Sequence, residues 1–279
     1  MIQAPAFFSD LAHPRGARIA LCVQYDGSPY VGWQLQPHLP HLKTVQGELE
    51  RALGSICAAP VRVHCAGRTD SGVHGIAQWV HFNLPAQRSL KACVIGTNGL
   101  LPASVRVTDA CVVPQGFHAR HSARSRTYDY LVINAPVYPA LLVKRALWVR
   151  EPLDVSAMES ALQALLGEQD FSAFRASACQ SRTPMRYLSE VQVLVRGEYL
   201  QFRVRANAFL HHMVRNIVGS ALEVGKGEQS ADWLGELLHG RDRSKAGPTA
   251  PAHGLYLTAV EYPREFSVPA VAAPPFLLS

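Results

Sequence analysis

One short segment of the sequence combines the residue types that chemistry on a substrate requires. It spans residues 64–75, with Asp70 at its centre, Arg68 two residues earlier and glycines at positions 67, 72 and 75. Glycine lets a backbone turn tightly or approach a ligand closely, because it has no Cβ. A carboxylate held in such a loop can attack or stabilise an electrophilic carbon. An isolated Gly-x-x-Asp is more often a surface turn in which the aspartate caps its own backbone, so the loop alone leaves both interpretations open.

The elements that must position this loop follow a regular order in the first half of the chain. Alternating apolar residues predict strands, and apolar residues at helical spacing behind Thr44 predict a capped helix. The expected order is a strand at 19–23, a helix at 45–56, strands at 61–65 and 77–82, a helix at 89–98 and a strand at 105–113. This β-α-β-β-α-β order is the ferredoxin-like split βαβ pattern.

The second half of the chain repeats the scheme with additions. We expect strands at 127–134, 187–195, 199–206 and 255–262, and helices at 155–166, 208–224 and 231–238. The helix at 155–166 has a capping box, with Ser156 as the cap and Glu159 as its partner. The sequence therefore predicts a duplicated α+β fold of two RRM-like halves, with two mixed, mainly antiparallel sheets flanking a cleft.

The predicted halves set the domain boundaries. We expect a loose arm at 1–16, an N-terminal domain at 17–115 that carries the Asp70 loop, a C-terminal domain at 116–264 and a proline-containing tail at 265–279. With 279 residues, of which 48% are hydrophobic, the chain is long enough to bury a substantial core.

Charge and cysteine content narrow the class of protein. A formal net charge of +6 suits a polyanionic partner without proving one. The six cysteines form no C-x-x-C pair and no zinc spacing, so we expect reduced thiols and no disulfide. The N-terminus does not have the pattern of a secretory signal, and no apolar run approaches membrane-spanning length. These features favour a cytoplasmic protein with no membrane partner.

Five segments of the sequence together indicate a family. Residues 65–75, 117–120, 128–130, 180–184 and 211–219 resemble, in the same order and at similar spacing, motifs of the tRNA pseudouridine synthase A family. The resemblance runs from about residue 18 to about residue 263. Two departures are mild: Ser71 stands where the family commonly has alanine, and residues 247–251 vary a loop near the end.

The resemblance implies an activity and a set of partners. It implies isomerisation of uridine to pseudouridine at positions 38, 39 and 40 of the tRNA anticodon stem-loop, with the catalytic loop inside the cleft between the halves. It also implies a homodimer with tRNA lying across both subunits. The reaction exchanges a bond from ribose C1′ to N1 of uracil for a bond to C5, so it conserves atoms and calls for no cofactor and no metal.

The resemblance also assigns roles to residues. Asp70 is the nucleophile, although attack at C1′, attack at C6 and removal of the C2′ proton all stay open. Tyr128 stacks on the base and is the candidate general base, which requires nearby cations because a phenol has a reference pKa of about 10. Arg68 and Arg215 are those cations and support base flipping. The substrate-binding residues are Tyr128, Phe117, His118, Ala119, Arg120, His121, Gln180, Ser181 and Arg182.

Two of these assignments have support from the residues themselves. Arg215 has apolar neighbours on both flanks, so its guanidinium would leave water only if paired, and Asp70 is the obvious partner. The run 118–126 holds three arginines, two histidines and no acid. Such a run is usually a solvated face, but its place beside Tyr128 favours phosphate binding by Arg120, Arg124 and Arg126.

Other functions fit the sequence less well. His211 and His212 are adjacent, hence about 100° apart if they lie on a helix, which suits polar contacts better than a shared metal. An aspartic protease needs two carboxylates, and no second Asp-Ser/Thr-Gly occurs. A base-excising glycosylase would also attack C1′ but would release free uracil. A non-catalytic RNA-binding protein is a third alternative, although no RNP1-type aromatic pattern is present.

Overall fold

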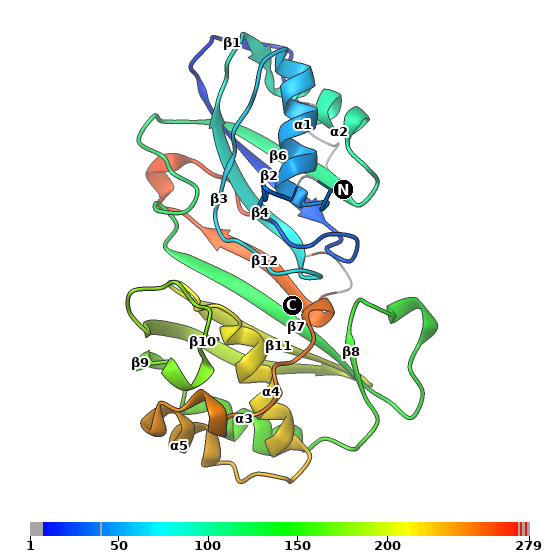
Figure 1. The fold of residues 1–279 in the computed structure, drawn as a ribbon, viewed down its shortest axis with the longest axis vertical. Coiled ribbons are helices and arrows are strands. Elements are labelled where there is room, and N and C mark those ends of the chain that lie inside the picture. The colour runs from blue at the N-terminus through cyan, green and yellow to red at the C-terminus, as the bar shows by residue number, and fades with distance from the viewer. Residues whose placement is uncertain (1–7, 40, 273, 275–276, 278–279) are drawn as a thin grey trace, which may run out of the picture. The chain divides into compact units, whose positions relative to one another are not determined.

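The computed structural model describes residues 8–39, 41–272, 274 and 277. The chain forms two compact units: unit 1 comprises Met1–Arg124 and Ala259–Val271, and unit 2 comprises Ser125–Thr258 and Ala272–Ser279 (Figure 1). Among the helices of the described ranges, none has the length and apolar character needed to cross a membrane.

Unit 1 is built on an antiparallel sheet with helices packed against it. Its main elements are β2 (Arg18–Tyr25), α1 (Val45–Cys57), β3 (His64–Cys65), β4 (His74–Asn83), α2 (Thr97–Leu100) and β6 (Val105–Val113). The strand order is β6-β2-β4, with β3 on the far side of β4. Counted along the chain within this sheet, β2 is the first strand, and it lies between the fourth (β6) and the third (β4). This is the order that the split βαβ pattern predicts.

The core of unit 1 lies between this sheet and α1, which runs along the sheet in Figure 1. Leu21 from β2 and Leu49 and Leu53 from α1 are fully buried. The helix begins where the sequence predicts it, because the Thr44 hydroxyl accepts a hydrogen bond from the Gly47 N–H at 3.1 Å.

Several smaller elements differ from the predictions for unit 1. The strand expected at 61–65 is reduced to β3, although Val61 and Val63 are buried as expected. The helix expected at 89–98 consists of a π-helical turn, Ala92–Gly96, followed by α2. The first seven residues of the predicted arm lie outside the described residues. The rest is not entirely loose, because β1 (Ala12–His13) pairs with β5 (Arg88–Ser89).

Unit 2 repeats the same strand order on a larger scale. Its elements are β7 (Ser125–Asn134), β8 (Leu147–Val149), α3 (Val155–Gln163), β9 (Gly167–Asp170), β10 (Met185–Arg196), β11 (Tyr199–Ala206), α4 (Met213–Gly225), α5 (Trp233–Gly240) and β12 (Leu255–Glu261), of which the residues up to Thr258 belong to this unit. The sheet order is β12-β7-β11-β10-β9, and β8 adds in parallel beside β7. Helices α3, α4 and α5 contact one another on one side of this sheet (Figure 1). The predicted duplicated α+β architecture is confirmed.

Helix α4 begins later than the sequence suggests. The sequence predicts a start at Ala208, but the helix begins at Met213, and His212 before it has a left-handed backbone with φ of 61°. The Asn207 side chain explains the delay, because its Oδ1 accepts hydrogen bonds from the Ala208 and Tyr187 N–H groups and keeps this stretch outside the helix. His211 and His212 therefore precede the helix, and their ring centroids lie 3.9 Å apart.

The cap of α3 also differs from the prediction. The N-cap is Asp154, whose Oδ1 accepts a hydrogen bond from the Ala157 N–H at 2.9 Å, and Ser156 lies within the first turn. The expected capping box is therefore wrong, because the helix begins one residue before its supposed cap.

The corrected cap predicts a difference between two substitutions. Asp154→Ala should lower the free energy of unfolding by about 1 kcal/mol, because it leaves an N–H of the first helical turn without its partner. Ser156→Ala, the matched control, should change it by less than about 0.5 kcal/mol, because Ser156 is exposed. Urea denaturation of both variants measures the difference. An equal or larger loss for Ser156→Ala would contradict the assignment of the cap.

Candidate active site

The Asp70 loop connects β3 to β4 in unit 1. The Val73 N–H donates to the Asp70 carbonyl at 3.2 Å, which closes a tight turn. Gly72 has a φ of 80° within this turn, a conformation that favours glycine. Asp70 is half-buried, and Arg68 is exposed beside it. The glycine at position 72 thus has the turn-forming role that the sequence predicts.

A buried amide holds the start of the loop. Gln78 lies on β4 with its side chain fully buried. Its Nε2 donates to the Gly67 carbonyl, and its Oε1 accepts from the Gly67 N–H at 3.3 Å. Because one side chain satisfies both backbone groups of Gly67, the loop is fixed to the sheet three residues before Asp70.

Thr69, the residue before Asp70, is held at two further points. The Tyr25 hydroxyl and the Thr69 hydroxyl form a hydrogen bond of 2.9 Å, and the Trp33 N–H donates to the Thr69 carbonyl at 3.0 Å. Ser71, on the other side of Asp70, donates its hydroxyl hydrogen to the Tyr30 carbonyl at 3.2 Å. The backbone on both sides of the carboxylate is therefore anchored.

Close packing around the loop depends on glycine at two further positions. A Cβ on Gly32, which has a φ of 109°, would lie 2.9 Å from the Thr69 carbonyl oxygen. A Cβ on Gly75 would lie 2.4 Å from the Tyr25 ring. Gly75 therefore makes room for the supporting tyrosine, a role that the sequence did not suggest.

The segment at 117–121 contributes both support and surface. Phe117 and Ala119 have fully buried side chains. The Phe117 ring packs against Tyr262 and Phe266, and the Ala119 carbonyl accepts a hydrogen bond from the Tyr262 hydroxyl at 2.7 Å. These two side chains are thus structural in this arrangement. Arg120 and His121 are exposed and His118 is half-buried, so these three can meet a substrate.

In unit 2, Tyr128 lies on β7 with an exposed fraction of only 8%. Its ring meets Phe209 edge to face at 5.1 Å between centroids, which fixes the ring plane. The neighbouring Tyr130 is fully buried and donates its hydroxyl hydrogen to the Pro251 carbonyl. Burial raises the pKa of Tyr130. Tyr130 is therefore a core residue with a tethered hydroxyl.

Arg215 occupies the first turn of α4 between buried apolar residues. Its Nε donates to the Ala250 carbonyl at 2.7 Å, and the Ala250 N–H donates to the Arg215 carbonyl at 3.1 Å. The loop at 247–251 packs against the helix at Gly219, where a Cβ would lie 1.7 Å from the Pro248 oxygen. The varied loop of this chain thus sets the position of Arg215. The pairing of Arg215 with Asp70 stays a prediction, since the two residues belong to different units.

The segment at 180–182 lies on a loop that hydrogen bonds from two arginine side chains hold in place. Arg175 donates to the carbonyls of Cys179 and Ser181 at 2.8 Å, and Arg186 donates to the Ser181 hydroxyl at 2.6 Å. Gln180 and Arg182 are exposed at the surface of this loop.

Arg126 is more buried than the other two arginines of the basic run. Arg126 lies on β7 with an exposed fraction of 9%, and its Nη1 donates to the Asn207 carbonyl at 2.9 Å. Arg126 lies two positions before Tyr128 on β7 and therefore on the same face of the strand, and its contact with phosphate stays a prediction. Arg120 and Arg124 are exposed, so the basic face of this run consists of these two arginines.

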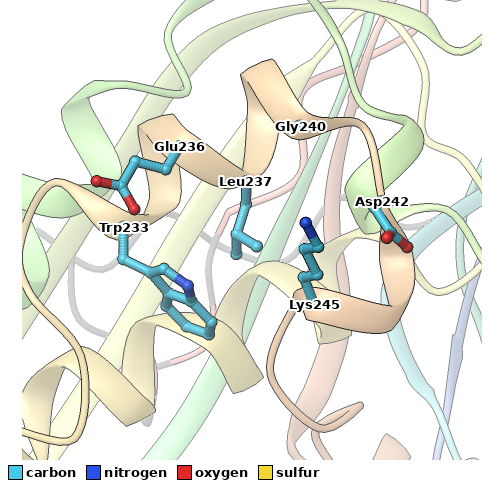
Figure 2. A pocket seen from close by; sticks show the side chains of 6 residues that line it. All are labelled: Trp233, Glu236, Leu237, Gly240, Asp242 and Lys245. Atoms are coloured by element: carbon cyan, nitrogen blue, oxygen red, sulfur yellow. The ribbon is translucent and has the colours of Figure 1, made fainter.

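A separate pocket of about 200 Å³ lies along α5 in unit 2 (Figure 2). Its lining residues are Trp233, Glu236, Leu237, Gly240, Asp242 and Lys245. None of them is a predicted site residue, and the candidate active site is therefore assigned to the anchored Asp70 loop rather than to this pocket.

Comparison with known proteins identifies the family. A family described as tRNA pseudouridine synthase matches residues 161–263. The tRNA pseudouridine synthase A of Paraburkholderia phymatum is 52% identical over 256 residues, which cover 92% of this chain and 95% of that protein. The proteins of the same name from Burkholderia ambifaria and Burkholderia vietnamiensis are each 52% identical over 252 residues, which cover 90% of this chain and 92% of each protein. The chain therefore belongs to the tRNA pseudouridine synthase A family and is an isomerase that acts on tRNA.

Proposed function

We propose that the chain isomerises uridines 38, 39 and 40 in the anticodon stem-loop of tRNA, with Asp70 as the nucleophile. The observation that carries this proposal is the anchoring of the Asp70 loop on both sides of the carboxylate by Gln78, Tyr25, Trp33 and Tyr30. A catalytic group must be held to within a fraction of an ångström, and the hydrogen bonds to this loop restrain the backbone beside the carboxylate.

The reaction requires four changes in bonding, which protein groups can assist. The bond from C1′ to N1 breaks, a bond from C1′ to C5 forms, the C5 proton leaves and N1 gains a proton. Asp70 supplies the carboxylate for the first of these changes. Tyr128 stacks on the flipped base and accepts the C5 proton. Arg68 and Arg215 compensate the negative charge and support the flipped nucleotide. Since atoms and electrons balance within the substrate, these residues need no metal and no cofactor.

Binding of the tRNA falls to the exposed residues of two segments. Arg120, His121 and His118 form one group, and Gln180, Ser181 and Arg182 form the other. We assign the arginines to phosphates, because guanidinium groups bind phosphate oxygens well.

The assembly and location form part of the same proposal. The enzyme acts in the cytoplasm, where its tRNA substrate is made, and as a homodimer. The connection from β7 to β8 supports self-association, because Val137, Leu141 and Val143 are exposed there.

Asp70→Asn tests the function directly, because it keeps the size of the side chain and removes the charge. Single-turnover formation of pseudouridine should fall by several orders of magnitude, as expected when a covalent catalyst is lost. The affinity for tRNA and the melting temperature should persist, since the hydrogen bonds that hold the loop come from other residues. A variant that still forms pseudouridine at about a tenth of the normal rate would remove Asp70 from the mechanism.

Gln78→Leu tests whether the anchored loop positions Asp70. The change leaves both backbone groups of Gly67 without their partner, so stability should fall by about 1 to 3 kcal/mol. Turnover should fall by about 100-fold if the carboxylate shifts by about 1 Å, while tRNA affinity stays unchanged.

The matched control is Gln201→Leu, which removes another fully buried glutamine from a strand of unit 2. The Gln201 amide donates to Asp129 at 2.9 Å, within unit 2. Both variants should lose stability, but only Gln78→Leu should lose turnover at saturating tRNA. Equal effects on turnover would mean that Gln78 acts through general stability alone.

A further inference from the structure

Four histidine rings gather on the surface of unit 1 and form what we call the histidine ledge: His64, His81, His118 and His121. The ring of His118 is central, with centroids 4.6 Å from His81, 4.3 Å from His121 and 5.5 Å from His64. His64 also stacks on His81 at 5.1 Å, with an angle of 25° between the ring planes. Segments far apart in the sequence, β3 with β4 and the turn after β6, thus build one aromatic surface.

The ledge has a buried base and an exposed edge. His81 is 3% exposed and rests edge-on against the buried Phe117 ring, with centroids 5.8 Å apart. His118 is half-buried, and His64 and His121 are exposed. His64 packs on His81 and His121 packs on His118. Because these contacts already restrict the outer rings, they lose less freedom when a flat ligand binds against them.

The hydrogen bonds of the inner rings argue against a metal centre. The His81 Nδ1 accepts from the Ala119 N–H at 3.1 Å. The His118 Nδ1 accepts from the Arg120 N–H at 3.1 Å and from the His121 N–H at 3.3 Å. A nitrogen that accepts a backbone hydrogen bond is not available as a metal ligand, and each ring keeps its hydrogen on Nε2.

The inner rings are neutral aromatic groups at neutral pH. Burial, together with the neighbouring His118, His64 and Arg18, lowers the pKa of His81 to about 4. Burial also lowers the pKa of His118, with His121, His64, Arg18 and Arg120 adding to the effect. The charged neighbours that act on these two rings are arginines, so the ledge combines π-faces with positive charge.

We propose that the histidine ledge is a stacking site for a nucleotide of the tRNA, outside the residues that act on the target uridine. A base would stack on the exposed rings of His64 and His121, and its phosphate would lie against Arg120. Aromatic faces beside positive charge are the combination with which proteins hold unpaired nucleotides. The proposal adds His64 to the RNA-binding residues and rests on the proposed function in that its ligand is the substrate RNA.

The test is the affinity for unmodified tRNA of paired substitutions at the two exposed rings. The double variant His64→Ala/His121→Ala should bind bulk tRNA transcript about tenfold more weakly, as expected for the loss of one stacked base. The double variant His64→Phe/His121→Phe keeps the flat π-faces and should bind within about twofold of the parent. Fluorescence anisotropy at one fixed salt concentration measures the dissociation constants, and melting temperatures confirm that the variants fold.

His239→Ala is the matched control, since His239 is an exposed histidine on α5 of unit 2. It should leave the affinity unchanged. Unchanged affinity in the alanine double variant would overturn the proposal. An equal loss in the alanine and phenylalanine variants would also overturn it, because the rings would then act through their nitrogen atoms rather than by stacking.

Binding and turnover separate this proposal from the proposed function. The dissociation constant needs no reaction, whereas the proposed function is tested by whether the parent protein forms pseudouridine. If the parent protein formed no pseudouridine but the variant still bound tRNA more weakly, the proposed function would fail and the ledge would stand. Normal turnover by the parent protein, together with unchanged affinity in the alanine double variant, would reject the ledge alone.

Discussion

The two hydrogen bonds between the Gln78 amide and the Gly67 backbone are the constraint on which the site depends. A short glycine-containing loop has many accessible conformations, so a carboxylate on it would be poorly placed without such a bond. Because the Gln78 amide is buried, leaving it unpaired would lower the free energy of unfolding, so the two hydrogen bonds stay formed. The hydrogen bonds of Tyr25 and Trp33 with Thr69 then also fix the residue beside Asp70.

Much of the scaffold could be predicted because hydrophobic spacing decides it. The spacing of apolar residues along β6 and along α1 arises from which residues face the core, and burial follows it there. Strand β2 was also predicted from alternating apolar residues, but it is buried on both faces. Duplication of the split βαβ order then fixes which strands are neighbours. The start of α4 and the cap of α3 were missed because single polar side chains, Asn207 and Asp154, decide them through local hydrogen bonds.

The sequence predicts the candidate catalytic residues but not the residues that hold them in place. Asp70, Arg68 and Tyr128 stand in motifs that identify a family, but motifs do not say what holds them. Gln78 and Tyr25 lie on strands, where one buried polar residue has no distinctive spacing. A basic run likewise does not reveal that one of its members, Arg126, is largely buried. The histidine ledge has no signal in the sequence, since its rings come from separate elements.

The central claim is that this chain itself carries out the isomerisation of uridine, and the fate of the hydrogen at C5 tests it most directly. Bulk tRNA transcript with tritium at C5 of its uridines would be incubated with the purified protein. We predict that tritium appears in water in the same molar amount as pseudouridine appears in the tRNA, with no free uracil. Retention of tritium, or release of free uracil in place of pseudouridine, would contradict the account.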